Sequence, residues 1–188
     1  MFLVIEGDNG SGKTTISGLM QKSGFHVVTD DSDVKELEKA GKKIPANTVE
    51  RIESFIKYNE FCSEKSRKYE KSLLVRYWVS TMAAAYADLV FSKDEVLEKA
   101  KTLAKKLRTP DLVVYLQCDY SERISRIEKR KTVEGDLGDD ISEGRNARYQ
   151  EIISLLSKMI PNWKVIQVSK KTPEQVMVEI KEYLKDFE

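Results

Sequence analysis

Residues 7–15 combine glycines, a lysine and hydroxyl groups at a spacing that suits phosphate chemistry. The pattern is a glycine, four further residues and then Gly12-Lys13-Thr14, and it directly follows the apolar residues 2–5. Glycines let the backbone turn tightly and bring its N–H groups close to phosphate oxygens, and a helix that begins near Lys13 adds a positive dipole. This phosphate-binding loop, or P-loop, predicts a site for a nucleoside triphosphate.

Several positions of the loop have a role that follows from their chemistry. Lys13 can reach the β- and γ-phosphates of ATP, and the hydroxyl of Thr14 can bind Mg²⁺. ATP and Mg²⁺ are therefore the expected cofactors. The nucleotide-binding residues that the loop predicts are Gly7, Asp8, Asn9, Gly10, Ser11, Gly12, Lys13, Thr14 and Thr15.

Length and composition predict a single globular domain over residues 1–188. Hydrophobic residues make up 40% and charged residues 34% of the chain, and the net charge is +1. This balance creates no global field that would attract nucleic acid or an anionic membrane surface. No leader-like segment precedes the P-loop, no apolar stretch approaches the about 20 residues that span a bilayer, and Cys62 and Cys118 lack metal-site or disulfide spacing. We expect a cytoplasmic protein that binds neither nucleic acid nor membrane.

Strand-like and helix-like segments alternate along the chain, and together they must position the loop. Apolar runs predict strands at residues 2–6, 25–29, 72–75, 111–116 and 164–168, with helical periodicity at 13–21, 47–71, 78–91, 94–107, 120–130 and 142–159, and a last helix from about residue 173. Such alternation is typical of a parallel sheet with helices on both faces. The predicted fold is a three-layer α/β P-loop domain with about five parallel strands.

Two segments interrupt this alternation. A charged segment after Asp33 is broken at Gly41 and Pro45, and we assign no strand or helix to it. Residues 132–141 contain glycines and acidic residues, which is typical of a mobile loop. With its flanking arginines at positions 126, 130, 145 and 148, this stretch predicts a lid over about residues 131–147. A lid suits a kinase, which must keep water away from ATP.

The classes of P-loop protein can be separated by the segments that accompany the loop. The Asn-Lys-x-Asp segment with which GTPases read guanine is absent. The apolar strand at residues 72–75 ends in Val75-Arg76, whereas a motor ATPase usually closes such a strand with an acidic metal ligand. Chain length and the predicted lid favour a small-molecule kinase.

Four sequence blocks resemble, in the same order, those of the thymidylate kinase family of nucleoside monophosphate kinases. They are residues 2–15, 76–81, 110–130 and 145–149. In turn they resemble the family's first strand and P-loop, its Asp-Arg-Tyr segment, its fourth strand with the next helix, and the helix that closes the lid. The resemblance implies phosphoryl transfer from ATP to a nucleoside monophosphate, with dTMP the foremost acceptor, and a possible homodimer.

The resemblance also implies roles for residues outside the loop. Arg76 would hold the phosphate of the acceptor, with Tyr77 and Ser80 beside it. Arg126 and Arg130 would lie near the adenine or the transferring phosphoryl group, and residues 169–173 would approach the adenine. The predicted catalytic residues are Lys13, Arg76 and Arg130.

The chain departs from the family on the acceptor side. Val75 and Asn9 stand where the family has Asp, and the second strand leads into Asp30 and Asp31 instead of Thr-Arg-Glu-Pro. One of these two carboxylates would supply the acidic group that is missing at Val75, and Asp30 is included in the predicted acceptor site. Because the altered residues contact the acceptor, two alternatives stay open. One is a kinase for a nucleoside or another small molecule, and the other is an ATP-binding protein with little catalysis.

Overall fold

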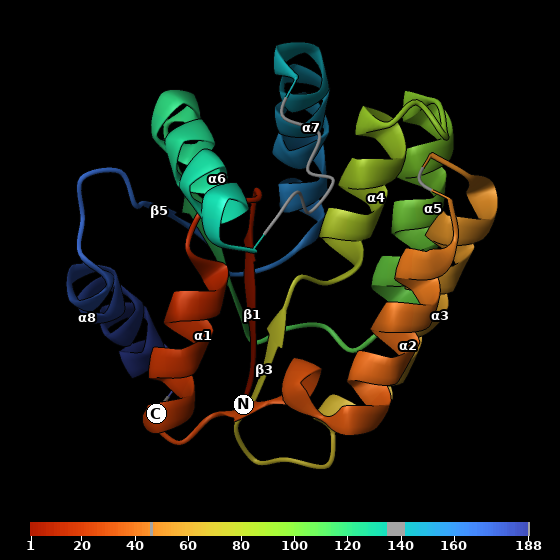
Figure 1. The fold of residues 1–188 in the computed structure, drawn as a ribbon. Helices are drawn as coiled ribbons and strands as arrows, with labels where there is room; N and C mark the ends of the chain where they lie inside the picture. The colour runs from red at the N-terminus through yellow and green to blue at the C-terminus, as the bar shows by residue number, and fades with distance from the viewer. Residues whose placement is uncertain (46, 135–141, 188) are drawn as a thin grey trace.

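A computed structural model describes residues 1–45, 47–134 and 142–187, and its centre is a five-stranded sheet. The strands are β1 (Phe2–Gly7), β2 (His26–Val27), β3 (Ser72–Val75), β4 (Leu112–Gln117) and β5 (Trp163–Gln167). Their order is β2-β3-β1-β4-β5, and every pairing is parallel. β1 therefore lies in the middle of the sheet, and the P-loop follows at its carboxyl end (Figure 1).

Helices cover both faces of the sheet, because successive side chains of β1 enter two different cores. Phe2 and Val4 belong to the core that includes residues of α3 (Val49–Ser66), α4 (Trp78–Ala87), α5 (Lys93–Lys106) and α7 (Glu143–Leu156). Leu3 and Ile5 belong to the core that includes residues of α1 (Lys13–Lys22) and α8 (Pro173–Leu184). This arrangement confirms the predicted three-layer α/β fold.

The helix α2 (Ser32–Lys43) occupies the charged segment to which the sequence analysis assigned no element, so the sequence analysis missed this helix. Only Val34 and Gly41 are buried on α2, and the remaining residues face solvent at least in part. The helix ends at Lys43, before Pro45, which cannot continue it. Within the described ranges, none of the helices has the length and apolar character needed to cross a bilayer.

The helix α6 (Tyr120–Glu134) lies next to the P-loop, and α7 follows it in the chain (Figure 1). Residues 132–134, which we predicted to be loop, belong to α6. The predicted lid at 131–147 therefore consists in part of the end of α6 and the beginning of α7. Its remaining residues, 135–141, lie outside the described part of the chain. Short 3₁₀ segments complete the fold at Val28–Asp30, Ser157–Met159 and Lys185–Phe187.

Candidate functional site

The loop between β1 and α1 has the backbone conformations that a phosphate cradle needs. Gly7, Gly10 and Gly12 have φ angles of 140°, 81° and 90°, which residues with a side chain rarely adopt. A Cβ on Gly7 would lie 2.7 Å from the carbonyl oxygen of Leu116, so no larger residue fits there. Because α1 begins at Lys13, its free N–H groups and dipole face the loop.

Lys13 is buried beneath this loop. Its residue surface is 8% exposed, and its Nζ donates to the carbonyl oxygen of Asp8 at 2.6 Å and to Ser11 Oγ at 3.5 Å. Burial, together with the nearby charge of Arg76, holds the pKa of Lys13 well below its ordinary value. The positive charge of Lys13 is therefore costly in the empty loop, and an anion bound there would offset that cost.

Arg76 follows β3, and its side chain turns toward the P-loop. The backbone of Arg76 is left-handed, with φ of 68°, a strained state for a residue with a side chain that is often found at functional sites. Its guanidinium donates to the side-chain oxygen of Asn9 and, at 3.3 Å, to Ser80 Oγ. The structure thus brings together Arg76, Ser80 and the P-loop, as the sequence predicts.

A buried carboxylate that the sequence analysis did not select supports this cluster from below. Glu6 is 0% exposed in β1 and accepts hydrogen bonds from the backbone N–H of Tyr77, at 2.9 Å, and from the hydroxyl of Ser80. Burial raises the pKa of Glu6, while the charges of Arg76 and Lys13 act in the opposite direction. A single carboxylate inside an apolar strand is the sequence signal that would have identified Glu6.

The Tyr77 side chain points away from the site and into the core. Tyr77 is 1% exposed, its ring packs edge-on against Phe2 with centroids 5.6 Å apart, and its hydroxyl donates to the carbonyl of Arg108 at 3.3 Å. Burial raises the pKa of Tyr77. The structure therefore brings the backbone of Tyr77 to the site and keeps its side chain away from the predicted acceptor position.

The carboxylates of Asp30 and Asp31 are at the opposite end of the sheet. The carboxylate of Asp31 lies 2.9 Å from His26 Nε2, and His26 pairs with Ser72, which is the first residue of β3. Arg76, by contrast, follows the last residue of β3. Asp30 is exposed and pairs with a lysine of α2 at 3.4 Å. Because β2 is only two residues long, the chain turns into α2 before reaching the P-loop end of the sheet. The structure does not bring Asp30 or Asp31 together with Arg76.

The predicted adenine position coincides with a cavity of about 240 Å³ beside α1. The cavity is lined by the P-loop, by Arg126 of α6 and by residues after β5, including Val168, Lys171 and Pro173. Arg126 donates to the carbonyl oxygen of Gly10 at 3.3 Å. Arg130 is partly buried one helical turn further along α6. The structure thus brings Arg126 and the segment at residues 169–173 together at the donor side of the loop.

Arg123, a third arginine of α6, makes the most buried polar contact of that helix with the loop. Its side chain is 7% exposed, pairs with the carboxylate of Asp8 and donates to the side chain of Asn146 at 2.8 Å. Gln150 donates to the same carboxylate at 2.5 Å. Gly10 permits this approach, because a Cβ there would lie 2.9 Å from Arg123 Cγ. We call Asp8, Arg123, Asn146 and Gln150 the Asp8 network; it joins the P-loop to α6 and α7.

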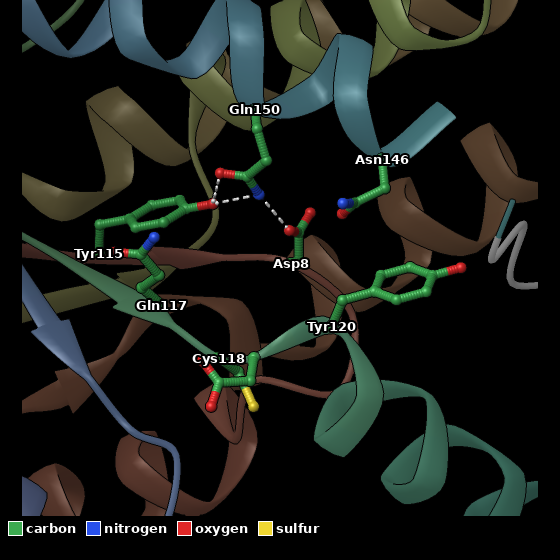
Figure 2. Close-up of a pocket in the computed structure, with 8 residues that line it drawn as sticks. Asp8, Tyr115, Gln117, Cys118, Tyr120, Asn146 and Gln150 are labelled. Atoms are coloured by element: carbon green, nitrogen blue, oxygen red, sulfur yellow. Dashed lines mark hydrogen bonds between the residues drawn. The ribbon is translucent and has the colours of Figure 1, made fainter. Parts of the chain in front are cut away.

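A second cavity, of about 340 Å³, adjoins the Asp8 network (Figure 2). Figure 2 shows the carboxamide of Gln150 between the hydroxyl of Tyr115 and the carboxylate of Asp8, and Asn146 facing the same space from α7. The residues that line the cavity are Asp8, Tyr115, Gln117, Cys118, Asp119, Tyr120, Asn146 and Gln150. Only Asp8 belongs to the P-loop, so this cavity is separate from the predicted adenine position.

The arginines at the start of α7 contact α4. Arg145 Nε lies 2.6 Å from the Asp88 carboxylate, and Arg148 Nε donates to the carbonyl of Ala87 at 2.9 Å. Both contacts reach the end of α4, whose first turn carries Ser80. These two arginines, which flank the loop of the predicted lid, therefore fix α7 beside α4.

The residues of the donor side fit a bound Mg²⁺. Thr14 is exposed in the first turn of α1, and Mg²⁺ at such sites is usually held by one or two protein oxygens together with substrate phosphates. Among the described residues, no group of three or more His, Cys, Asp or Glu side chains would hold a metal ion alone. The ion would therefore be bound jointly by Thr14 and the triphosphate.

A protein-family model described as "AAA domain" matches residues 3–153, so the chain belongs to the AAA domain family. This assignment agrees with the P-loop and with the parallel sheet around it. A search of curated protein sequences found no match.

Two kinds of solved kinase structure have a similar fold. One is the deoxyadenosine kinase from M. mycoides with the products dCMP and dCDP, at 18% identity, a TM-score of 0.68, and coverage of 99% of this chain and 100% of that chain. The other is the thymidylate kinase from Candida albicans, at 16% identity, a TM-score of 0.69, and coverage of 98% and 91%. At these identities the likeness concerns the fold. The chain therefore has the P-loop fold that nucleoside and nucleotide kinases share. The thymidylate kinase family, which the four sequence blocks resemble, has this same fold.

Proposed function

We propose that this protein transfers the γ-phosphoryl group of ATP to a nucleoside monophosphate, and that dTMP is the first acceptor to test. The observation that carries the proposal is the position of the Arg76 guanidinium, which contacts both Asn9 of the P-loop and Ser80. A lysine under the loop and an arginine directly after the neighbouring strand can hold two phosphate groups next to each other. Phosphoryl transfer depends mainly on such positioning and charge neutralisation.

On the donor side, the loop amides and Lys13 hold the triphosphate, and the adenine occupies the cavity beside Arg126. The hydroxyl of Thr14 holds Mg²⁺, which offsets phosphate charge when bound. The pKa of Lys13 is lowered by burial in the empty loop, so triphosphate binding favours its protonated form.

On the acceptor side, the phosphate replaces the Asn9 side chain as the hydrogen-bond acceptor of Arg76. Glu6 and Ser80 act as positioning residues: Glu6 holds the Ser80 hydroxyl and the Tyr77 backbone, and Ser80 in turn contacts Arg76. The chain of contacts fixes the guanidinium before the acceptor arrives, which lowers the entropic cost of binding.

A kinase for a nucleoside is the second candidate, and a specific observation favours it. The fold is as similar to the deoxyadenosine kinase, with a TM-score of 0.68, as to the thymidylate kinase, with 0.69. In addition, β3 ends in the apolar Val75, so the acceptor side lacks the acidic residue that the thymidylate kinase resemblance leads one to expect. An ATP-binding protein with little catalysis is the third possibility.

An assay of ADP release in the presence of Mg²⁺, run with a panel of nucleoside monophosphates and nucleosides, tests the proposal. Stimulation by dTMP or another monophosphate supports it, stimulation by nucleosides alone supports the second candidate, and ATP binding without ADP release supports the third.

A pair of matched variants tests the role of Arg76. Arg76→Lys keeps the charge but loses the forked donor geometry, so the KM for a monophosphate acceptor should rise at least about tenfold while the KM for ATP changes little. Arg67→Lys, at the exposed end of α3, is the control and should change neither. An unchanged acceptor KM in Arg76→Lys would show that Arg76 does not hold the acceptor phosphate.

A further inference from the structure

The cavity beside Asp8 has no role in the proposed phosphoryl transfer. Tyr149 and Gln150 are neighbours on α7 and point to different places: the Tyr149 hydroxyl donates to Ser80 at 3.4 Å, whereas Gln150 contacts Asp8 and Tyr115 in the cavity (Figure 2). Among the described residues, none that line this cavity belongs to the Arg76–Ser80 cluster or to the lining of the cavity beside Arg126. A ligand held there would be neither the ATP nor the acceptor of the proposed reaction.

The lining of the cavity is polar but carries no uncompensated positive charge. The side chains of Gln117, Asn146 and Gln150 end in carboxamides, each of which both donates and accepts hydrogen bonds. Asp8 is already paired with Arg123 and Gln150. Among the described residues that line the cavity there is neither a lysine nor an arginine, and Asp119 adds a second carboxylate.

We propose that this cavity binds an uncharged nucleoside. Its volume of about 340 Å³ is at the lower end of the range of about 300–1,000 Å³ that is usual for small-molecule sites. Carboxamides match the mixed donor and acceptor edge of a nucleobase, the Tyr115 hydroxyl reaches the cavity at Gln150, and the partly exposed Tyr120 in the lining provides aromatic contact. The exposed carboxylate of Asp119 disfavours a phosphorylated ligand by like-charge repulsion.

The Asp8 network would transmit the presence of this nucleoside to the donor loop. The carboxylate of Asp8 contacts Gln150 at the cavity, while its backbone carbonyl accepts a hydrogen bond from Lys13. A ligand that moves Gln150 or Asn146 changes the contacts that hold Asp8, and so changes the affinity of the loop for ATP. By thermodynamic linkage, ATP must change the affinity for the nucleoside by the same factor. This regulation lies beyond the proposed reaction and does not depend on it.

Titration calorimetry on the full chain tests the site by direct binding. The four natural deoxynucleosides are added one by one to protein saturated with a non-hydrolysable ATP analogue, so that the donor site is filled. We expect one of them to bind once per chain, more tightly than its own 5′-monophosphate. We also expect its dissociation constant to differ between the analogue-free and the saturated protein.

Two variants locate the binding. Gln117→Leu alters an exposed residue that should not affect folding, and Asn146→Ala removes a second carboxamide; each should weaken nucleoside binding about tenfold, as expected for a lost hydrogen bond. Gln21→Leu, an exposed glutamine in the last turn of α1, is the matched control and should leave binding unchanged.

Several results would overturn the proposal. One is that no deoxynucleoside binds to the saturated protein, and another is that Gln117→Leu and Asn146→Ala both bind it like the wild type. Tighter binding of the monophosphate would contradict the charge argument. If the bound nucleoside were itself phosphorylated, with a KM that rises in Gln117→Leu, the cavity would be the acceptor site instead. Because the binding assay needs no turnover, it tests the nucleoside site even if the protein shows no kinase activity.

Discussion

Lys13 is the residue on which the proposed reaction depends most directly. Lys13→Met keeps the length of the side chain but removes the charge that would meet the triphosphate. We expect turnover to fall by about two to three orders of magnitude, the usual loss when one preorganised donor to a transition state is removed. Steady-state ADP release measures this, and circular dichroism confirms the fold. Lys22→Met, at the exposed end of α1, is the control; equal turnover in both variants would refute the donor assignment.

The buried charge of Lys13 should also make the stability of the empty protein depend on pH. Because the pKa of Lys13 is lowered by folding, the unfolded chain binds more protons than the folded protein between that lowered pKa and the ordinary value of 10.5. The free energy of unfolding is therefore lowered by protonation of Lys13 at low pH, and it rises with pH across this window. Lys13→Met should be more stable than the wild type near neutral pH, and the difference should shrink toward pH 10.5.

Urea unfolding of both proteins at a series of pH values measures that difference. A difference in the free energy of unfolding that stays constant with pH would mean that the Lys13 ammonium is not destabilised by burial.

Residues of the donor loop could be predicted from the sequence because their chemistry is local. Lys13 and Thr14 sit at fixed offsets from the glycines, and one strand-to-helix turn places them. Arg123 could not be selected in this way, because it stands three residues before Arg126 on the same charged helix. Only the packing of α6 on Gly10 shows that Arg123 is the one that is buried. The prediction that Asp30 lies in the acceptor site has a related weakness, because the sequence shows where the second strand begins but not how early it ends.

At the scale of elements, the ion pair of Asp8 and Arg123 connects the P-loop to α6. Both side chains are largely buried, at 12% and 7% exposure, so removing one partner leaves the other charge unpaired. Arg123→Met should destabilise the protein by about 3–5 kcal/mol, and adding Asp8→Asn should recover part of that loss. Urea unfolding of the wild type, the two single variants and the double variant measures the coupling. Additive effects would show that the pair does not act as a unit.

The strands were easier to predict than the helices that cover them. β1 and β4 are buried on both faces over most of their length, so each contains a continuous apolar run, at residues 2–5 and 112–116. In α2, by contrast, burial of Val34 and Gly41 is the main link to the core, and the other positions are charged or polar with few exceptions. A helix that buries so little leaves almost no periodic signal, and Gly41 further lowered its predicted helicity.

At the scale of the whole molecule, the two tryptophans report on different parts of the structure. Trp78, the first residue of α4, is 2% exposed in the core, whereas Trp163 on β5 is only partly buried and stacks on Tyr115. Trp78→Ala should cost about 3–5 kcal/mol, as is usual for a large aromatic residue removed from a core, and Trp163→Ala should cost clearly less. Urea unfolding followed by circular dichroism compares them, and equal costs would contradict this description of the core.

The two cations that would meet phosphate are already satisfied by oxygens of the loop itself. Lys13 donates to the Asp8 carbonyl, and Arg76 donates to the side chain of Asn9. An incoming anion must therefore displace these oxygens, and chloride or a single inorganic phosphate gains little by doing so. A nucleoside triphosphate together with a second phosphate group can displace both. We expect these loop oxygens to compete with any incoming anion, so that the loop binds polyanions in preference to the abundant simple anions of a cell. Inorganic phosphate should therefore inhibit ATP binding only weakly, which a competition binding assay can measure.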